Sequence, residues 1–386
     1  MHIVHLTPYY APAYSFGGVV RMVAGLARAQ HTRGHSVTVL TTDALSVTAR
    51  VTNRESDTVE DGIRVIRCRN LIQGLRRFNL STPLNMPQVA KNVFSRHAVD
   101  VLHIHEFRTA EAHLITPIAR AHGIATVLSP HGTLTHSTGR SALKSVWDTV
   151  LSPKVADNIQ HVIALTDDER DEVQALWAQW DAQIAVSVVP NGVNLQTYTT
   201  LPDDMPFRAR YGLGEKRVIL FMGRLHQRKG VDVLAKAFLQ ADMPDAVLVL
   251  AGPDEGMRPT LEALNDERII LTGFLDGEAR LQALASADLF ALPATGEGLS
   301  MAVLEAMAAG LPVLLSPGCH LPQVAQTGAG IIVEPTVSQL TEAIADMLND
   351  EVSLHRMGRS ARHLVKTTFT WEQVAAQMDA VYEGLS

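Results

Sequence analysis

Short apolar runs alternate with helical segments along the chain, and this alternation limits the possible folds most. Residues 2–6 are expected to form a strand, residues 18–30 a helix and residues 36–41 a second strand. The helix carries its apolar side chains at helical spacing, at Val19, Val20, Val23, Leu26 and Ala27. Similar apolar runs follow at 63–66, 99–104, 125–128, 162–165 and 186–189. Strands alternating with helices predict a mostly parallel sheet.

The same alternation of strands and helices begins again after a polar, proline-containing segment. We place a linker near residues 190–216, where Asn191-Gly192 is followed by Pro202 and Pro206. Strands are expected at 218–222, 247–251, 269–271, 289–292 and 313–315, and helices at 231–240, 277–285, 301–309 and 371–385. The 386 residues therefore predict an α/β chain with two doubly wound, Rossmann-like domains facing across a cleft. The expected domains are residues 1–195 and 196–368, with a helix at 369–386 packing back toward the first.

Several protein classes are disfavoured by the composition. Cys68 and Cys319 are the only cysteines and form neither a disulfide framework nor a paired-cysteine metal motif. The N-terminus lacks the features of a signal peptide, and no apolar run approaches the roughly 18 residues of a membrane span. We expect a cytoplasmic protein. The net charge of −7 argues against nucleic acid as the main partner.

Positive charge is concentrated in one stretch of the first half. Residues 62–97 contain no acidic residue and seven basic ones, namely Arg64, Arg67, Arg69, Arg76, Arg77, Lys91 and Arg96. Such a stretch suits anionic lipid headgroups or a phosphate-bearing acceptor. The alternative is a solvated loop and helix face, which is the more common meaning of a charge run.

The segment 221–230 joins an expected strand to an expected helix. Arg224 and Lys229 flank a loop that opens onto the helix N-terminus, where free amides and the helix dipole favour an anion. A diphosphate could bind there. The alternative is a solvated basic loop.

The segment 295–307 is more specific. Glu297 has a glycine on each side and precedes a helix, so backbone amides can approach a ligand closely. Glu305 lies within an apolar helical run, where a carboxylate requires a partner. Two acceptors a helical length apart, with amides between them, suit a nucleotide sugar.

These segments resemble retaining glycosyltransferases with two Rossmann-like domains (the GT-B type), in the group 1 or family 4 class. The resemblance covers nearly the whole chain, and its matching pieces occur in the family's order. They are Gly17-Gly18, Pro130-His131-Gly132, Val189-Pro190-Asn191-Gly192-Val193, Gly223-Arg224 with Lys229-Gly230, Gly273-Phe274, Glu297 with Glu305, and Phe369-Thr370-Trp371.

The resemblance implies roles for individual residues. Arg224 and Lys229 would bind the donor diphosphate, Glu305 the ribose hydroxyls, and Glu297 the sugar, as the catalytic pair with His131. The donor would also contact Gly298, Leu299, Ser300, Phe274, Leu275, Gly17 and Gly18. The first domain would bind the acceptor and the second the nucleotide sugar. Taken without the resemblance, His131 is simply a turn histidine.

The expected reaction moves a mannose- or glucose-type hexose to a hydroxyl of a saccharide or lipid-linked oligosaccharide, in bacterial cell-surface or exopolysaccharide synthesis. GDP-mannose is favoured over UDP-hexoses by the resemblance. The acceptor would attack from the face that the nucleoside diphosphate leaves, with retention, and the enzyme could associate peripherally with the inner face of the plasma membrane.

We expect no cofactor and no metal. No Asp-x-Asp motif is present, and His103-Ile104-His105-Glu106 could bind a metal but has no third ligand at usable spacing. A dinucleotide oxidoreductase is disfavoured because no Gly-x-Gly-x-x-Gly follows a strand. A nucleotide-sugar epimerase on the same fold is the main alternative, and a non-catalytic binding subunit is another.

Overall fold

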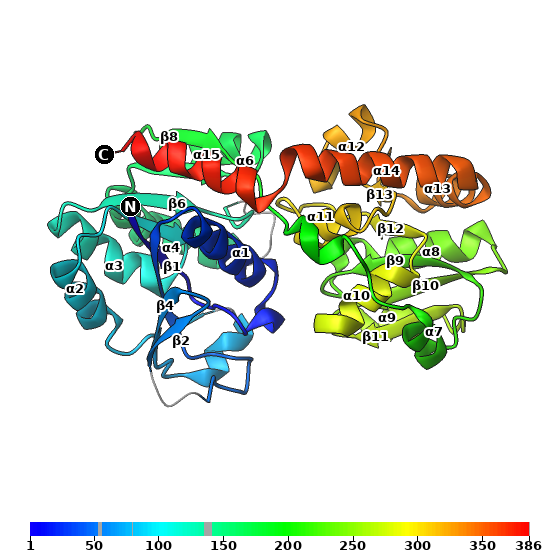
Figure 1. Cartoon of the computed structure of the whole chain (residues 1–386), viewed down its shortest axis with the longest axis horizontal. Coiled ribbons are helices and arrows are strands. Elements are labelled where there is room, and N and C mark those ends of the chain that lie inside the picture. Colours follow the sequence, from blue (N-terminus) through cyan, green and yellow to red (C-terminus); the bar gives the residue numbers. More distant parts are fainter. Residues whose placement is uncertain (53–55, 79, 135–140, 386) are drawn as a thin grey trace. The chain divides into compact units, whose positions relative to one another are not determined.

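The computed structural model describes residues 1–52, 56–78, 80–134 and 141–385. The chain divides into two compact units (Figure 1). The N-terminal unit comprises Met1–Gly192 with Trp371–Ser386, and the C-terminal unit comprises Val193–Thr370. Each unit is built on a predominantly parallel sheet with helices, so the predicted α/β class with two Rossmann-like domains is confirmed.

The N-terminal unit contains an eight-stranded sheet in the order β3-β4-β2-β1-β5-β6-β7-β8. Its strands are β1 His2–Leu6, β2 Ser36–Thr42, β3 Asp57–Glu60, β4 Ile63–Cys68, β5 Val101–His105, β6 Ala125–Ser129, β7 His161–Ala164 and β8 Ala185–Val188. Among its described strands, only the edge pair β3 and β4 is antiparallel. The central strand β1 pairs with β2 on one side and with β5 on the other, where His5 aligns with His103.

Helices complete the N-terminal unit. They are α1 Gly18–Thr32, α2 Met86–Arg96, α3 Ala110–Ala121, α4 Ser141–Val150, α5 Ser152–Ala156, α6 Asp167–Ala178 and α15 Trp371–Glu383, with 3-10 turns η1 Tyr14–Phe16 and η2 Gln73–Phe78. Helices α3 and α6 are capped by Thr109 and Thr166, whose side chains accept hydrogen bonds from the amides of Ala112 and Glu169. The apolar core runs from Leu102 and Leu128 in the sheet to Trp177 on α6.

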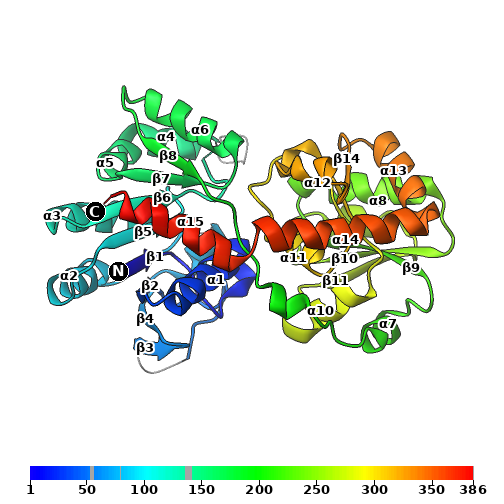
Figure 2. The ribbon, with the colours of Figure 1, turned by 45° about the horizontal axis from the view of Figure 1, so that its top comes forward.

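The last helix, α15, lies against α1 in the N-terminal unit (Figure 2). Its first residue, Trp371, packs on two glycines. A Cβ atom on Gly25 would lie 2.3 Å from Cε2 of Trp371, and one on Gly192 would lie 2.6 Å from Cε3. Only glycine at both positions leaves room for the indole ring.

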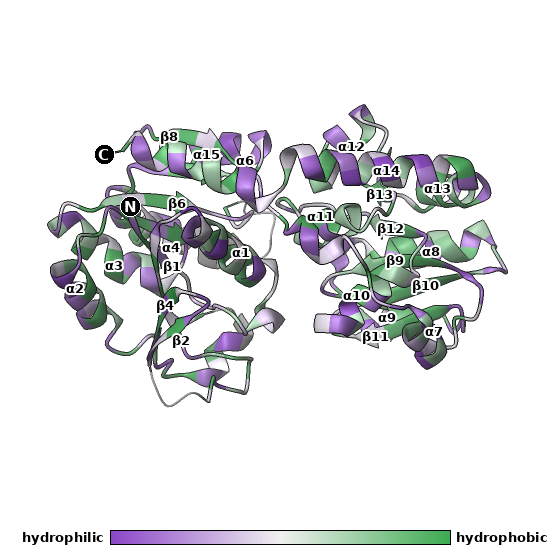
Figure 3. Cartoon of the chain, viewed as in Figure 1, coloured by the Kyte–Doolittle hydropathy of each residue, from purple (hydrophilic) through white to green (hydrophobic). Residues whose placement is uncertain are grey.

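The C-terminal unit contains a six-stranded parallel sheet in the order β11-β10-β9-β12-β13-β14. Its strands are β9 Arg217–Met222, β10 Ala246–Ala251, β11 Ile269–Gly273, β12 Leu289–Leu292, β13 Val313–Leu315 and β14 Gly330–Ile332. Every residue of β10 and β12 is buried, because helices cover both faces of such a sheet. In Figure 3 these strands are correspondingly coloured as hydrophobic.

The helices of this unit are α7 Met205–Tyr211, α8 Val231–Ala241, α9 Arg258–Glu262, α10 Gly277–Ser286, α11 Met301–Ala308, α12 Gln323–Gln326, α13 Val337–Asn349 and α14 Glu351–Thr368, with 3-10 turns η4 Leu195–Tyr198, η5 Gln227–Lys229 and η6 Pro317–Cys319. Helix α11 stops before Gly310, whose φ of +86° turns the chain toward β13. Helix α7 and the 3-10 turn η4 lie within the expected linker, which is therefore partly helical. Among the described residues, no helix is both long and apolar enough to span a membrane.

Candidate functional site

Three loops of the C-terminal unit carry the predicted donor-binding residues. They follow β9, β11 and β12, and because these strands are parallel the loops emerge at one edge of the sheet. This edge, at the carboxyl ends of the strands, is where open parallel sheets bind ligands. The structure therefore brings Arg224, Lys229, Phe274, Glu297 and the start of α11 to the same edge.

Lys229 and Glu297 are in direct contact. The Lys229 Nζ and Glu297 Oε2 atoms form an ion pair, and both side chains are mostly buried, with 16% and 19% of their surfaces exposed. Burial, together with the positive charge of Arg224, lowers the pKa of Lys229 to about 7. The carboxylate of Glu255 opposes this shift because it stabilises the ammonium form.

The loops that follow β9 and β12 are also tied together by hydrogen bonds. Nη2 of Arg228 donates to the Gly296 carbonyl at 2.6 Å, and the Thr295 amide donates to the Arg228 carbonyl at 2.9 Å. Gly230 has a φ of +67°, and a Cβ atom there would lie 2.2 Å from the Pro293 carbonyl oxygen. Residue 230 of the Lys229-Gly230 motif must therefore be glycine, because only glycine permits this close approach.

Arg224 lies on the rim of the site and is 44% exposed on its side chain. Its Nη1 lies 3.1 Å from each carboxylate oxygen of Glu255. The guanidinium group is held in place but remains accessible to a ligand.

Glu305 is buried on α11, and its partner is Arg280 on α10. Both nitrogens Nη1 and Nη2 of Arg280 also lie 3.3 Å from the Tyr198 hydroxyl. Burial lowers the pKa of Arg280, but Glu305 and Tyr198 outweigh that effect, so the net pKa is raised and the guanidinium stays charged. The sequence predicted that this carboxylate needs a partner; it did not identify Arg280 or Tyr198.

The other residues of this unit predicted to contact the donor follow β11 or lie just before α11. Phe274 follows β11 and is 46% exposed, whereas Leu275 is buried. The amides of Gly298 and Ser300 donate to no protein acceptor within the described residues. Leu299 is buried beside them. The start of α11 thus offers free donors and the positive end of a helix to an anionic or hydroxyl-rich ligand.

The predicted residues of the N-terminal unit lie at the corresponding edge of its own sheet. Gly17 has a φ of +118° and precedes α1, which begins at Gly18. His131 follows β6 with a φ of +58°, a region that non-glycine residues seldom occupy. Glu169 accepts a hydrogen bond from the Gly132 amide at 2.5 Å. Such an unusual backbone conformation is often found at functional sites.

His103 and His105 lie on one face of β5, as their spacing predicted, and both are fully buried. The structure adds His5, which aligns with His103 on the neighbouring strand. One nitrogen from each of the three histidines lies within 4.8 Å of the others. Sequence spacing did not indicate this third histidine, because it comes from a different strand.

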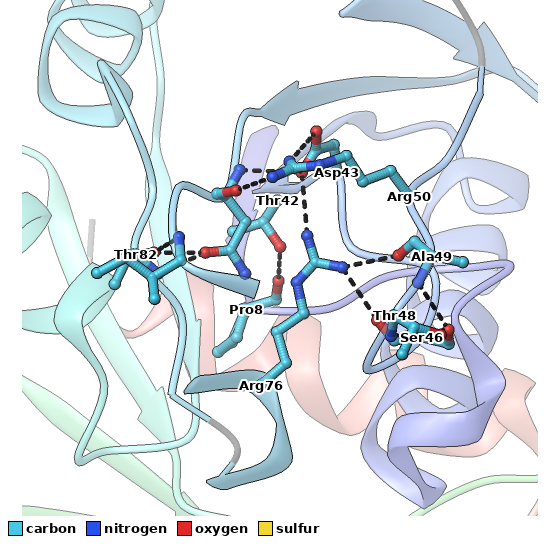
Figure 4. A network of polar contacts seen from close by, with 11 residues as sticks. Pro8, Thr42, Asp43, Ser46, Thr48, Ala49, Arg50, Arg76 and Thr82 are labelled. Carbon is cyan, nitrogen blue, oxygen red and sulfur yellow. Dashed lines mark hydrogen bonds and ion pairs between the residues drawn. The ribbon is translucent and has the colours of Figure 1, made fainter. Parts of the chain in front are cut away.

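The basic stretch 62–97 is partly neutralised within the protein. Arg64 pairs with Asp57 at 2.7 Å and Arg67 pairs with Glu60, both acidic partners coming from β3 just before the stretch. Arg76 is fully buried, and its Nη1 donates to the Ser46 and Ala49 carbonyls at 3.0 and 2.7 Å (Figure 4).

Arg76 therefore faces neither lipid nor solvent, so both interpretations of the basic stretch are wrong for this residue. It holds the loop after β2, where Asp43 pairs with Arg50 (Figure 4). The side chain of Arg77 lies outside the described part of the chain. Arg69, Lys91 and Arg96 are exposed.

Comparison with known families agrees with this architecture. Residues 17–192 match the family described as "Glycosyl transferase 4-like domain", and residues 205–364 match "Glycosyl transferases group 1". The chain belongs to the group 1 (family 4) glycosyltransferases, and its fold is GT-B.

Individual relatives are similar over much of the chain. A GDP-mannose-dependent alpha-(1-6)-phosphatidylinositol monomannoside mannosyltransferase from Mycolicibacterium smegmatis is 28% identical over 288 residues, which cover 70% of this chain and 73% of the relative. A D-inositol 3-phosphate glycosyltransferase from Jonesia denitrificans is 27% identical, covering 99% and 95%.

Solved structures share the fold. Sucrose-phosphate synthase from Thermosynechococcus elongatus superposes with a TM-score of 0.79 at 21% identity, covering 100% of this chain and 98% of that one. Anabaena HepE in complex with UDP and glucose superposes with a TM-score of 0.77 at 18% identity, covering 100% of both chains.

Proposed function

We propose that this glycosyltransferase moves a hexosyl group, with retention of anomeric configuration, from a nucleoside-diphosphate sugar to an acceptor hydroxyl. The observation that supports the donor class most strongly is the Lys229 and Glu297 ion pair beside Arg224, at the ligand-binding edge of the C-terminal sheet. A diphosphate supplies the negative charge that a partly buried lysine and a rim arginine can bind together.

In this proposal, the diphosphate replaces Glu297 as the main partner of Lys229. The carboxylate of Glu297 can then accept hydrogen bonds from hydroxyls of the donor sugar, alongside the amides of Gly298 and Ser300. Glu305, held by Arg280, accepts bonds from the ribose hydroxyls, and the segment around Phe274 contacts the base. Roles in the donor site are also proposed for Leu275 and Leu299 and, from the family resemblance, for Gly17 and Gly18 of the N-terminal unit.

The chemical step requires charge stabilisation at the leaving group. The acceptor oxygen forms a new bond to the anomeric carbon on the face from which the diphosphate oxygen leaves, and that oxygen takes the acceptor proton. Arg224 and Lys229 offset the negative charge that develops on the leaving diphosphate, so we infer that no metal is required. His131 is proposed to contact the transferred sugar.

We also propose which donor and which class of acceptor the protein uses. The mannosyltransferase relative is named for GDP-mannose, which makes GDP-mannose the first donor to test. We propose a saccharide or lipid-linked saccharide acceptor in bacterial cell-surface polysaccharide synthesis, bound by the N-terminal unit on the cytoplasmic side.

Peripheral membrane association is proposed for the segment after β4. Leu71 and Ile72 are 52% and 54% exposed and follow the exposed Arg69, a combination of apolar and cationic groups that suits a membrane interface. The double variant Leu71→Glu and Ile72→Glu should lose cosedimentation with anionic vesicles. Val352→Glu, at a 77% exposed residue of the other unit, is the control and should not. Equal sedimentation of all three proteins would refute the association.

The function is tested by incubating the chain with GDP-mannose or a UDP-hexose and candidate acceptors, with and without EDTA. Proton NMR should show a glycoside with the donor's anomeric configuration, at the same rate in EDTA. An inverted product would refute retention, and loss of activity in EDTA would refute metal independence. An isomerised nucleotide sugar formed without acceptor would indicate an epimerase instead.

A further inference from the structure

Gln30 and three histidines form a continuous chain of hydrogen bonds in the N-terminal unit. Nε2 of His5 lies 2.7 Å from Oε1 of Gln30. Nδ1 of His5 lies 2.9 Å from Nε2 of His105, and Nδ1 of His105 lies 3.0 Å from Nε2 of His131. The chain therefore connects a glutamine on α1 to the proposed functional histidine after β6, through strands β1 and β5.

A second set of contacts continues from the nitrogen of the Gln30 amide. Its Nε2 donates to the Tyr382 hydroxyl on α15 at 3.2 Å. That hydroxyl lies 2.7 Å from Nδ1 of His103, and Nε2 of His103 lies 2.8 Å from Oγ of Ser129. Gln30, Tyr382 and His103 are fully buried, so water does not compete with these bonds.

The rings in this chain are neutral. Burial lowers the pKa of His5 to about 4 and that of His131 to about 3, and it lowers the pKa of His103 and His105 well below the usual value. A neutral imidazole has one donor and one acceptor nitrogen. Each ring must therefore donate to one neighbour and accept from the other.

The direction of donation follows from Gln30. The Oε1 atom can only accept, so His5 carries its proton on Nε2 and accepts at Nδ1. His105 then donates from Nε2 and accepts at Nδ1, which requires the His131 proton on Nε2. The Nδ1 atom of His131 is left with a lone pair. Reversal of the amide would reverse every proton in the chain.

A metal bound by His5, His103 and His105 is the alternative explanation of the cluster. The His5 and His105 rings have centroids 5.1 Å apart and planes at 26°, and the His105 and His131 rings have centroids 5.2 Å apart and planes at 14°. With nitrogen separations of 2.9 and 3.0 Å, such nearly coplanar rings lie edge to edge. Ligands of one metal would instead point their lone pairs at a common centre. The geometry favours hydrogen bonds.

We propose that Gln30, His5 and His105 are positioning residues that fix the tautomer of His131, so that His131 Nδ1 accepts a hydrogen bond from a hydroxyl of the bound sugar. The part concerning the sugar rests on the proposed function. The part concerning the tautomer rests only on the contacts within the N-terminal unit.

The tautomer is measured by nitrogen NMR of the full chain labelled with 15N-histidine. Wild-type His131 should show a protonated Nε2 and an unprotonated Nδ1. Gln30→Leu should shift His131 toward a mixture of tautomers, although Gln30 reaches His131 only through His5 and His105. His105→Leu should do the same, whereas His105→Gln offers one donor and one acceptor and should restore the wild-type pattern. Thr126→Val, at a buried residue of β6 whose hydroxyl bonds the Ile124 carbonyl, is the control and should leave the pattern unchanged.

The kinetic arm uses the same variants. His105→Leu should lower kcat by about 10- to 100-fold with little change in donor KM, the size of effect seen when the hydrogen-bond partner of a metal-bound histidine is removed, and His105→Gln should recover most of it. An unchanged kcat in His105→Leu would overturn the positioning role.

An unaltered His131 tautomer in Gln30→Leu would overturn the hydrogen-bonded chain, as would stoichiometric metal in the purified wild type that His5→Gln removes. The nitrogen shifts do not depend on turnover. A wild-type chain without transferase activity would therefore refute the proposed function, while the shifts would still decide the tautomer inference.

Discussion

The ammonium group of Lys229 and the carboxylate of Glu297 form an ion pair between the loops that follow β9 and β12. The sequence indicated these two residues separately, one for phosphate and one for sugar. Their contact means that the two proposed functions are electrostatically coupled, because whatever binds one residue changes the surroundings of the other. The loops around them are tied through Arg228, so the pair is held at a defined place.

The first prediction concerns this pair. Lys229→Met and Glu297→Gln should each lower transfer by about 10² to 10³-fold, as expected for loss of a preorganised charge contact. Lys236→Met, which removes an exposed lysine from α8, is the matched control and should retain activity. Initial rates are compared after circular dichroism has shown an intact fold. Near wild-type rates in both site variants would show that the site is assigned wrongly.

The buried pair of Glu305 and Arg280 should matter for stability. Arg280→Met leaves the buried carboxylate uncompensated and should lower the free energy of unfolding by about 3–5 kcal/mol. Replacing both residues by apolar ones should recover part of this loss without restoring donor binding. The exposed pair of Arg258 and Glu262 is the control, because Arg258→Met should cost less than about 1 kcal/mol. Urea unfolding measures these differences, and equal losses in the two arginine variants would contradict the account.

Donor affinity should fall as pH rises through about 7. Lys229 has its pKa lowered to about 7, and its protonated form binds the diphosphate, so binding is strong below this pH. Above it, the dissociation constant should increase by up to about tenfold per pH unit. Lys229→Arg keeps its charge and should show little dependence between pH 6 and 8.5. Calorimetric titration with GDP measures the dissociation constant at each pH. The same change with pH in the wild type and in Lys229→Arg would show that a group other than Lys229 causes it.

The buried histidines predict acid sensitivity. The pKa of His5 in the folded chain is about 4, below the unfolded value of about 6.5, so the unfolded state binds more protons between these values. The free energy of unfolding is therefore unaffected by His5 above about pH 6.5 and decreases as the pH falls toward 4. Each such histidine contributes up to about 1.4 kcal/mol per pH unit.

Urea unfolding at pH 7, 6 and 5 tests this dependence. His5→Gln should reduce the slope of stability against pH, whereas His355→Gln, at a 71% exposed side chain, should not. The expectation fails if the two variants have the same slope as the wild type.

The sequence predicted the fold class and most central strands because buried parallel strands are continuous apolar runs, as in β10 and β12. It did not predict β3 or α7. The strand β3 alternates exposed and partly buried residues at a sheet edge, and α7 is only seven residues long within a polar segment. Both depend on tertiary packing more than on local pattern.

The candidate site shows the same limit. Glycines and charges adjacent to strands indicated Arg224, Lys229 and Glu297. The partners Arg280 and His5 were missed because each reaches its site from another element of the sheet or helix layer, and one sequence does not show which strands become neighbours. The acidic residues of β3 that neutralise Arg64 and Arg67 were missed for the same reason.

The donor site is tested most directly by the binding of GDP and UDP to the wild type and to Lys229→Met, measured by calorimetry with thermal unfolding in parallel. One of the two diphosphates should bind the wild type and, at 100 times its dissociation constant, add about 2.7 kcal/mol to the free energy of unfolding. Lys229→Met should lose most of this gain. Absence of binding by both diphosphates, or equal binding by both proteins, would contradict a donor site at the carboxyl ends of β9 and β12.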